Sequence, residues 1–223
     1  MRTLRTLAVL AVMGFASAAF ATDQIDNPEY ARWSQYKPGT FVTTQQTMDM
    51  PGMAAANPNM PAGMNMASMM PQTKTTTKLT EVKPDALTLE VSIDTTQAGR
   101  TTSNKTTRTV TAKIDKPATT APAVEGVQGE VKDLKEGKET VDLKGAKVDT
   151  VTKEFTTVLT GSPMAGGRAA RGGGPTTPTT AHMKIWTSTT IPGGMVKTET
   201  TTTVEQMGDM KITQTVVDYD IAK

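Results

Sequence analysis

The chain contains no cysteine, a single histidine and few aromatic side chains, which make up 4% of its 223 residues. Without cysteine there is no disulfide framework, no thiol nucleophile and no site for N-terminal lipid modification. Hydrophobic residues account for 36% of the chain, which is low for a globular domain. We therefore expect stability to come from the pairing of strands and from a thin apolar layer.

The first 21 residues follow the pattern of a secretory signal peptide. Arg2 and Arg5 form a positive start, residues 7–19 form a short apolar stretch, and an Ala-Phe-Ala sequence ends at residue 21. The apolar stretch is too short to span a bilayer, and no second one follows. We expect cleavage between Ala21 and Thr22, a mature chain of 202 residues, and a periplasmic or secreted location.

The charge of the expected mature chain is balanced. The whole chain has 24 Lys and Arg against 22 Asp and Glu, and the signal segment takes away two Arg and no acid. The 22 basic and 22 acidic side chains that remain provide no basic surface of the kind that nucleic-acid binding requires. We expect no nucleic-acid partner and, after processing, no transmembrane segment.

Threonine makes up roughly one residue in five, and its β-branched side chain favours strands over helices. Apolar and polar residues alternate most clearly at residues 86–94. Similar signals predict strands at residues 40–50, 73–83, 101–114, 139–143, 147–159, 181–188, 195–206 and 211–221. Turns are expected at Lys144-Gly145 and Gly208-Asp209. The predicted fold class is mainly β: a curved antiparallel meander, half-barrel-like, of about eight or nine strands.

A short helix is predicted before the first of these strands. Asn27 is a suitable N-cap, and the Lys-Pro-Gly sequence at residues 37–39 ends the helix. Three aromatic residues recur at helical spacing and form one stripe: Tyr30, Trp33 and Tyr36. Such a stripe is typical of a helix packed against a sheet.

Three long segments lack strand signals: residues 51–72, 116–137 and 161–180. They are rich in Pro, Gly, Ala and polar residues, and long segments of this kind are either functional or disordered. We expect disorder in most of the last two. The mature chain is expected to be a single β domain, residues 22–223, with these loops.

Methionine is concentrated around the first loop, where eight of the 15 Met lie between residues 48 and 70. Thioethers are soft ligands that favour Cu(I), but Met also provides adaptable apolar contact. The residues leave open copper binding, an apolar lid over the sheet, and partner recognition. The copper hypothesis uses Met48, Met50, Met53, Met64, Met66, Met69, Met70 and His182.

Sequence motifs for catalysis are missing. A Ser-His-Asp arrangement would have to use His182, yet no Gly-x-Ser-x-Gly motif is present. The glycine clusters at residues 166–167 and 172–174 lack the Gly-Lys-Ser/Thr of a phosphate-binding loop. We therefore predict that the chain is not an enzyme and has no catalytic residues and no cofactor, with copper as the one alternative.

Two stretches carry specific motifs. Residues 27–40 contain Asn-Pro-Glu-Tyr-Ala, then Trp33 and Lys-Pro-Gly-Thr, and residues 184–197 contain Lys-Ile-Trp-Thr-Ser and Ile-Pro-Gly-Gly-Met-Val-Lys. The Pro-Gly-Gly sequence at residues 192–194 is expected to be a structural turn, because proline fixes φ at its entry and glycine permits positive φ.

In these motifs the chain resembles a family of small exported bacterial proteins of uncharacterised function. Members often carry a cysteine in the hairpin near residues 147–155, which is missing here, so a role for it does not transfer. The fold that the resemblance implies is similar to the curved half-barrel of periplasmic lipoprotein carriers.

The leading functional hypothesis is an exported, non-catalytic protein that binds an apolar ligand, a lipid or a lipidated or envelope protein partner, in a curved sheet capped by the helix. The expected contacts, each of which could equally be core, are Trp33, Tyr36, Leu87, Leu89, Val91 and Ile93. The alternatives are a Met-rich Cu(I)-binding protein or metallochaperone, and a purely structural envelope protein.

Overall fold

The computed structural model describes residues 24–50, 70–115, 130–159, 179–204 and 208–223. The segment expected to be a signal peptide and most of the Met-rich loop lie outside the described residues. The described elements are β1 (Gln24–Asp26), α1 (Pro28–Ser34), β2 (Phe41–Asp49), β3 (Gln72–Val82), β4 (Ala86–Gln97), β5 (Arg100–Thr111), β6 (Lys113–Asp115), β7 (Val131–Leu143), β8 (Ala146–Leu159), β9 (Thr179–Thr187), β10 (Met195–Val204) and β11 (Gly208–Asp220).

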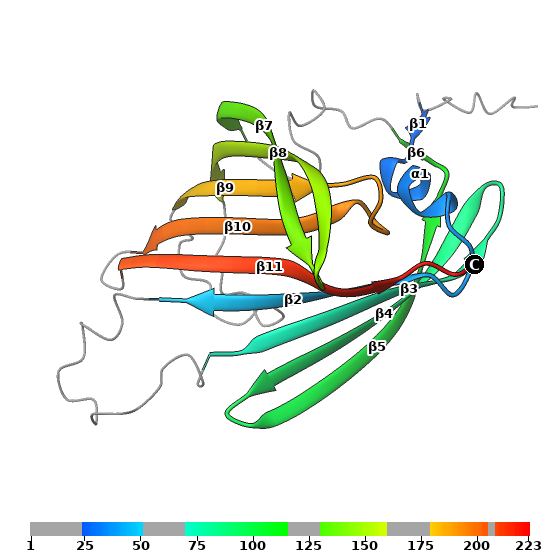
Figure 1. Cartoon of the computed structure of the whole chain (residues 1–223), viewed down its shortest axis with the longest axis horizontal. Helices are drawn as coiled ribbons and strands as arrows, with labels where there is room; N and C mark the ends of the chain where they lie inside the picture. Colours follow the sequence, from blue (N-terminus) through cyan, green and yellow to red (C-terminus); the bar gives the residue numbers. More distant parts are fainter. Residues whose placement is uncertain (1–23, 51–69, 116–129, 160–178, 205–207) are drawn as a thin grey trace, which may run out of the picture.

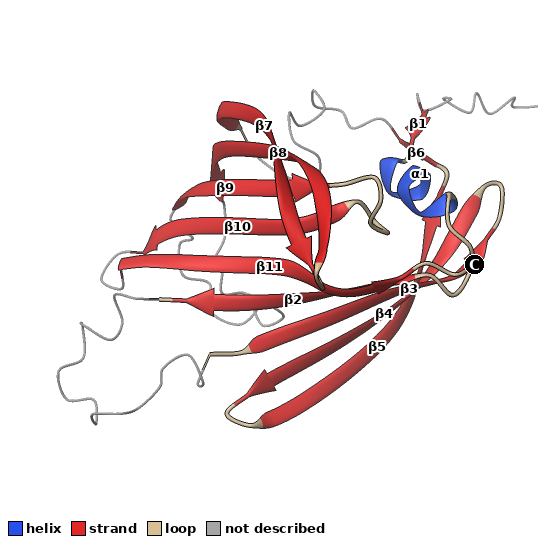
Figure 2. Cartoon of the chain, in the orientation of Figure 1, coloured by secondary structure: helices blue, strands red, loops and turns tan. Residues whose placement is uncertain are grey.

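Nine of these strands form one antiparallel sheet in the order β5-β4-β3-β2-β11-β10-β9-β8-β7. The sheet consists of two meanders, β2 to β5 and β7 to β11, which are joined where β2 pairs with β11. Figure 1 shows that the sheet is strongly curved and twisted, and Figure 2 shows how little of the described chain is helical. The predicted fold class is confirmed.

Strand β4 illustrates why the Thr-rich sequence forms this sheet. Alternate side chains of a strand point to opposite faces, and Leu87 and Leu89 are fully buried while Thr88 and Glu90 are not. The neighbouring strand contributes Leu79, which pairs with Leu89 and is also fully buried. The burial does not extend along the whole strand, because Ile93 is 36% exposed.

The loop predicted at residues 116–137 is wrong at its C-terminal end, where β7 begins at Val131. The segment is rich in Lys, Glu and Gly, which is unusual for a strand. It is nevertheless paired with β8 from Val131↔Thr157 to Leu143↔Ala146, with one irregularity between Lys132 and Lys135. An edge strand tolerates such charged residues because one side of it faces solvent.

The helix is confirmed, and it is shorter than its aromatic stripe. Helix α1 spans Pro28–Ser34, and the side chain of Asn27 accepts a hydrogen bond from the Glu29 backbone N–H. The strand expected at residues 101–114 is divided into β5 and β6, and β6 pairs with β1 in a separate two-stranded sheet. This small sheet lies next to α1 in Figure 1.

The main core lies where α1 meets the sheet. Trp33 of the helix is 3% exposed. It belongs to one cluster of buried side chains with Val42, Leu79, Leu87, Leu89, Val110, Leu143, Val148, Trp186, Ile191, Val196 and Val216. A second, smaller cluster surrounds Phe155, with Val131, Met183 and Ile185 packed against it.

The β7–β8 hairpin has an unusual path. Its turn is at Lys144 and Gly145, as expected, and both residues have positive φ, +55° and +81°. Figure 1 shows that the end of the hairpin leaves the side of β9 and crosses β10 and β11. There Lys144 forms an ion pair with Asp218 of β11. The hairpin therefore forms a wall beside the sheet.

Candidate functional site

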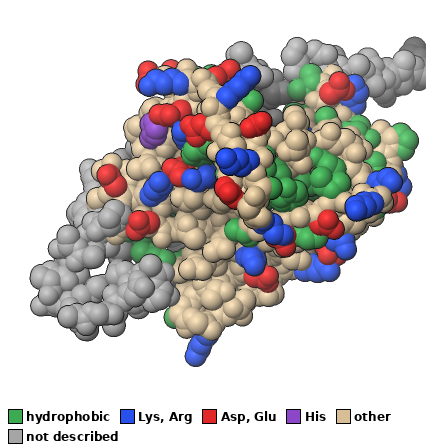
Figure 3. Space-filling model, viewed as in Figure 1, with side chains coloured by type: hydrophobic (Ala, Val, Ile, Leu, Met, Phe, Trp, Pro, Cys, Tyr) green, Lys and Arg blue, Asp and Glu red, His purple; other side chains and the backbone are tan. Residues whose placement is uncertain are grey.

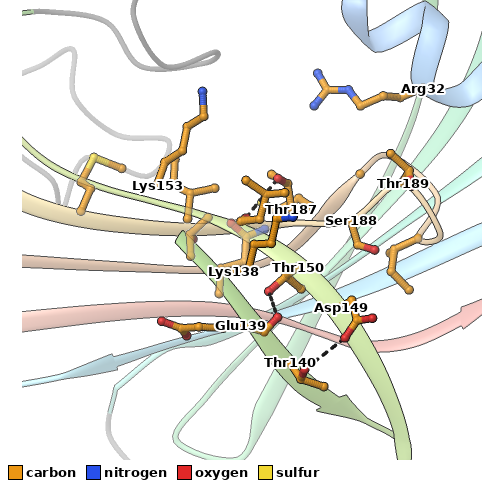
Figure 4. Close-up of a pocket in the computed structure, with 18 of the residues that line it drawn as sticks. Arg32, Lys138, Glu139, Thr140, Asp149, Thr150, Lys153, Thr187, Ser188 and Thr189 are labelled. Atoms are coloured by element: carbon orange, nitrogen blue, oxygen red, sulfur yellow. Dashed lines mark hydrogen bonds between the residues drawn. The ribbon is translucent and has the colours of Figure 1, made fainter. Parts of the chain in front are cut away.

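A cavity of about 1300 Å³ lies between α1, the β9–β10 loop and strands β7 to β11. Alternate residues of the central strands line it: Met183, Ile185 and Thr187 of β9, Thr198 and Thr200 of β10, and Ile212 and Gln214 of β11. This alternation means that one face of the sheet forms the cavity floor. Figure 4 shows the remaining walls, the β7–β8 hairpin and Arg32 of α1.

The cavity has an apolar part. The apolar side chains that line it are Val151, Met183, Ile185, Ile191, Met195 and Ile212. Val151 is 43% exposed, although a valine of this kind is normally covered in a folded domain. In the view of Figure 3, hydrophobic side chains gather between the β7–β8 hairpin and α1, with charged side chains around them.

The cavity also has polar and charged groups. Three of its lining residues are cationic, Arg32, Lys138 and Lys153, and two are acidic, Glu139 and Asp149. Asp149 accepts a hydrogen bond from Thr140 at 3.1 Å. Hydroxyl groups come from the end of β9 and the loop that follows it, at Thr187, Ser188 and Thr189. The combination of an apolar floor with a few charged groups is typical of a small-molecule site.

Helix α1 is held over the cavity from both ends. At its N-terminus, Glu29 forms an ion pair with Arg108 of β5, and the Asn27 side chain donates to the Thr111 carbonyl at 2.8 Å. Beyond its C-terminus, the Tyr36 hydroxyl donates to the Thr189 carbonyl at 3.1 Å, and burial raises the pKa of Tyr36. These contacts fix the helix between the two meanders.

Helix α1 packs against the Pro-Gly-Gly turn at residues 192–194. Both glycines have positive φ, +77° and +79°. A Cβ atom at Gly193 would lie 3.2 Å from the Trp33 ring, and one at Gly194 would lie 2.7 Å from Cδ of Arg32. The turn is structural, as expected. In addition, its lack of side chains is what allows Trp33 and Arg32 to pack against it.

The hairpin wall is fixed by Glu139. Its carboxylate accepts hydrogen bonds from Lys184 Nζ at 2.5 Å and from Trp186 Nε1 at 2.7 Å. The bond from Lys184 is the main cause that holds the pKa of Glu139 below its usual value, and the bond from Trp186 adds to it. Lys184 and Lys197 also lie 4.8 and 4.9 Å from the centroid of the Trp186 ring, a cation–π arrangement.

The second anchor of the hairpin is the pair between Lys144 and Asp218. The hydrogen bond between them raises the pKa of Lys144 and lowers the pKa of Asp218. Leu143 and Val148, on either side of the turn, are buried in the main core. The cavity wall is therefore secured by apolar packing as well as by charge.

None of the six side chains expected to contact an apolar ligand lines the cavity. Trp33, Leu87 and Leu89 belong to the packed core, and Tyr36 packs against it. Val91 and Ile93 lie further along β4, away from α1. The structure thus brings the predicted helix and β4 together as core, and the cavity lies beside them, over the second meander.

Among the described residues of the copper hypothesis, His182 and Met48 lie on opposite faces of the sheet. His182 pairs with Thr201 while its neighbour Met183 pairs with Thr200, so His182 points to the face opposite the cavity floor. It forms a 3.2 Å contact with Glu154 there. Met48 pairs with Ile212 and so faces the cavity side, Met50 is buried, and Met70 is described but lies outside the strands. Met53, Met64, Met66 and Met69 lie outside the described residues.

The described residues contain neither a cluster of metal-ligating side chains nor a helix that could span a membrane. In the described part of the chain, no three or more His, Cys, Asp or Glu side chains are grouped so that they could hold a metal ion. Among the same residues, no helix is long and apolar enough to cross a membrane.

Sequence reasoning did not find Arg32, Lys138 or Lys153. Arg32 looks like a solvated residue on the polar side of a short helix, and the two lysines lie among other charged and polar residues of the sequence. No local pattern distinguishes them, because their common position depends on the curvature of the sheet and the path of the hairpin. The lining residues of β9 gave a partial signal, the alternation of Met183, Ile185 and Thr187.

Comparison with known proteins assigns neither a family nor a function to this chain. No family model matches the chain, and no curated protein matches it. A solved structure of an exported protein with a YmcC-like fold from Bacteroides fragilis is similar, with 8% sequence identity and a TM-score of 0.42. The match covers 83% of this chain and 97% of that chain. At this identity and TM-score, neither the family nor the function of this chain follows from the likeness.

Proposed function

We propose that this chain is an exported, non-catalytic binding protein that holds the alkyl chain of a lipid, free or attached to a protein, in the cavity of its curved sheet. The observation that carries the proposal is the cavity itself. Its volume of about 1300 Å³ is as large as the sites that hold drug-sized ligands, which span about 300–1,000 Å³.

The apolar floor of the cavity supports an alkyl chain as the ligand. Met183 and Ile185 lie on β9 and Ile212 lies on β11, on either side of β10, and all three face the same space. Each buried methylene group of a ligand contributes about 0.8 kcal/mol, so a chain laid across this floor gains affinity with its length. An exposed Val151 at the edge of the floor is explained in the same way, because a ligand would cover it.

Export rests on the sequence pattern of residues 1–21. An extracytoplasmic protein with an alkyl-binding cavity is suited to carry or sequester a lipid or a lipidated protein between membranes. The balanced charge of the mature chain also agrees with a partner other than nucleic acid.

The absence of catalysis is supported by the position of the only histidine. His182 points away from the cavity floor and contacts Glu154. The acids that line the cavity, Glu139 and Asp149, are already hydrogen-bonded to Lys184 and Trp186 and to Thr140. The hydrogen bond from Lys184 lowers the pKa of Glu139, which is opposite to the shift that a general acid at neutral pH requires.

Native mass spectrometry of residues 22–223, purified from a periplasm without detergent, tests the proposal. We expect adducts with the masses of lipids or fatty acids, and adducts of protein mass if the ligand is a lipidated chain. Thr200→Trp, which fills the cavity floor, should remove these adducts. Thr203→Trp is the matched control, because residue 203 points to the opposite face. A clean mass for the unmodified chain would contradict the proposal.

A further inference from the structure

One cationic side chain at the cavity, that of Arg32, is held in place by contacts within the protein before any ligand binds. Arg32 lines the cavity, and Figure 4 shows its guanidinium group reaching from α1 toward it, on the same side as the ammonium group of Lys153. The Arg32 Nε–H donates to the Pro28 carbonyl at 3.2 Å. The aliphatic part of the side chain lies against Gly194, where a Cβ atom would approach Cδ to 2.7 Å.

This arrangement reduces the cost of using Arg32 in binding. An arginine side chain loses conformational entropy when it is immobilised. Here Pro28 and Gly194 already restrict it, so less is lost when a ligand binds.

Two lysines add positive charge to the same cavity. Lys138 of β7 pairs with Val151 of β8. Lys153 is two residues beyond Val151 on β8 and therefore lies on the same face of the sheet. Lys153 forms an ion pair with Glu136 at 3.1 Å, which compensates part of its charge, and Glu136 itself does not line the cavity. Lys138 and Lys153 therefore border the apolar floor formed by Val151 and Ile185.

Both acids that line the cavity have hydrogen-bond partners of their own. Glu139 is neutralised by Lys184 and bonded to Trp186. Asp149 accepts a hydrogen bond from Thr140. Figure 4 shows Glu139 and Asp149 on the side of the cavity away from Arg32 and Lys153. The part of the cavity beneath α1 thus combines cations with the hydroxyl groups of Ser188 and Thr189, a set of groups suited to an oxyanion.

We infer that the ligand is an anionic amphiphile, one alkyl chain with a carboxylate or phosphate head, and that Arg32 binds the head group while the chain lies over Ile185, Met183 and Ile212. The inference rests on the proposed function. The planar guanidinium group matches the geometry of a carboxylate or phosphate through two parallel hydrogen bonds. Lys138 and Lys153 attract the same group from the opposite wall.

The test compares ligands that differ only in the head group. Binding of palmitate, palmitoyl lysophosphatidylglycerol, palmitoyl lysophosphatidylcholine and monopalmitoylglycerol to residues 22–223 is measured by isothermal titration calorimetry, below the concentrations at which they form micelles. We expect the two anionic ligands to bind at least about tenfold more tightly than the neutral one, since charge-assisted hydrogen bonds are worth more than 1.4 kcal/mol. The stronger of the two identifies the head group as carboxylate or phosphodiester.

Variants assign the effect to Arg32. Arg32→Gln should lower the affinity for the anionic ligands about tenfold and leave that for monopalmitoylglycerol unchanged. The double variant Lys138→Gln/Lys153→Gln should reduce the same preference by a smaller factor. Lys37→Gln is the control, because Lys37 is an exposed cation just beyond α1 that does not line the cavity. Circular dichroism checks that each variant is folded.

The possible outcomes distinguish the head-group inference from the proposed alkyl-binding function. Equal binding of all four ligands, or an anion preference that survives in both Arg32→Gln and the double lysine variant, would overturn the head-group inference and leave the alkyl-binding cavity standing. Failure of every ligand to bind would overturn both. Loss of the anion preference in Arg32→Gln alone, with the neutral ligand unaffected, is the result that the structure leads us to expect.

Discussion

At position 194 the absence of a side chain meets two separate requirements. The backbone has φ of +79°, a region that costs an L-residue about 1–2 kcal/mol, and the space is occupied by Arg32. Gly99 has nearly the same φ, +76°, but nothing within 4 Å of the position of a Cβ atom. The two glycines allow the backbone cost to be separated from the steric cost.

Gly194→Ala should therefore destabilise the protein more than Gly99→Ala. We expect about 1 kcal/mol for Gly99→Ala from backbone strain, and a larger loss for Gly194→Ala because Arg32 or the turn must move. Urea unfolding followed by circular dichroism measures both. Equal losses would show that Arg32 moves aside freely, and this would also weaken the view of Arg32 as a fixed anchor.

Glu139 ties stability to pH. Its pKa is lowered in the folded chain, mainly by the hydrogen bond from Lys184, and the usual value for Glu is about 4.3. A lowered pKa means that the contribution is fully present above the usual value and is lost as the pH falls through the folded value. The melting temperature should thus fall below about pH 4.3, and Glu139→Gln should reduce that part of the decrease.

Differential scanning calorimetry between pH 3 and pH 7 checks this expectation. The control is Glu81→Gln, because Glu81 is exposed and its partners, Lys83 and Thr88, are surface contacts in the β3–β4 hairpin, away from the β7–β8 hairpin. If Glu81→Gln and Glu139→Gln had the same effect on the pH dependence, the hydrogen bonds to Lys184 and Trp186 would have no special role in anchoring the hairpin.

At the scale of the element, α1 depends on Asn27. Helices shorter than about 12 residues are marginal in water, and α1 has seven. Its position therefore depends on tertiary contacts. The side chain of Asn27 provides two of them, because it accepts from the Glu29 N–H at 3.0 Å and donates to the Thr111 carbonyl at 2.8 Å.

Asn27→Ala should lower the free energy of unfolding by roughly 1–2 kcal/mol, since it removes the cap and the link to β5. Asn27→Asp keeps an oxygen to cap the helix and loses the donor to Thr111. Chemical denaturation of the three proteins should place Asn27→Asp between the other two. A variant Asn27→Asp as unstable as Asn27→Ala would show that the link to β5, and not the cap, holds the helix.

At the scale of the whole molecule, β2 and β11 join the two meanders. They pair from Phe41↔Asp220 to Asp49↔Lys211, so the first and last strands of the sheet domain depend on each other. The cavity floor and α1 belong to different meanders, and they are brought together by this joint and by the contacts of α1 with the β9–β10 loop. The long segment between β2 and β3, by contrast, connects two strands that pair directly, from Phe41↔Lys78 to Gln46↔Thr73.

Replacement of residues 51–69 by a short Gly-Asn-Gly turn should leave the sheet intact, because the register of β2 and β3 is set by the strands themselves. Circular dichroism and the melting temperature measure this outcome. The same variant tests the copper hypothesis: if the Met-rich loop is a Cu(I) site, uptake of Cu(I) should be lost while the fold survives. Unchanged uptake would refute that hypothesis.

The sequence by itself determined which segments become strands, because threonine and alternating apolar residues act locally. It also determined the cap at Asn27, the turn at Lys144-Gly145 and the Pro-Gly-Gly turn, since each depends on the backbone preferences of one or two residues. The strand character of residues 131–137 was missed, because pairing with β8 overrides a charged composition.

Only the tertiary structure decided where a ligand could be held. Trp33, Leu87 and Leu89 look equally suited to a core and to a binding site in sequence, and packing against one another made them core. Arg32, Lys138 and Lys153 lie more than 100 residues apart at the extremes and show no common pattern. They share a cavity because β2 pairs with β11, the sheet curves, and the β7–β8 hairpin crosses it, and these are long-range effects that no local preference encodes.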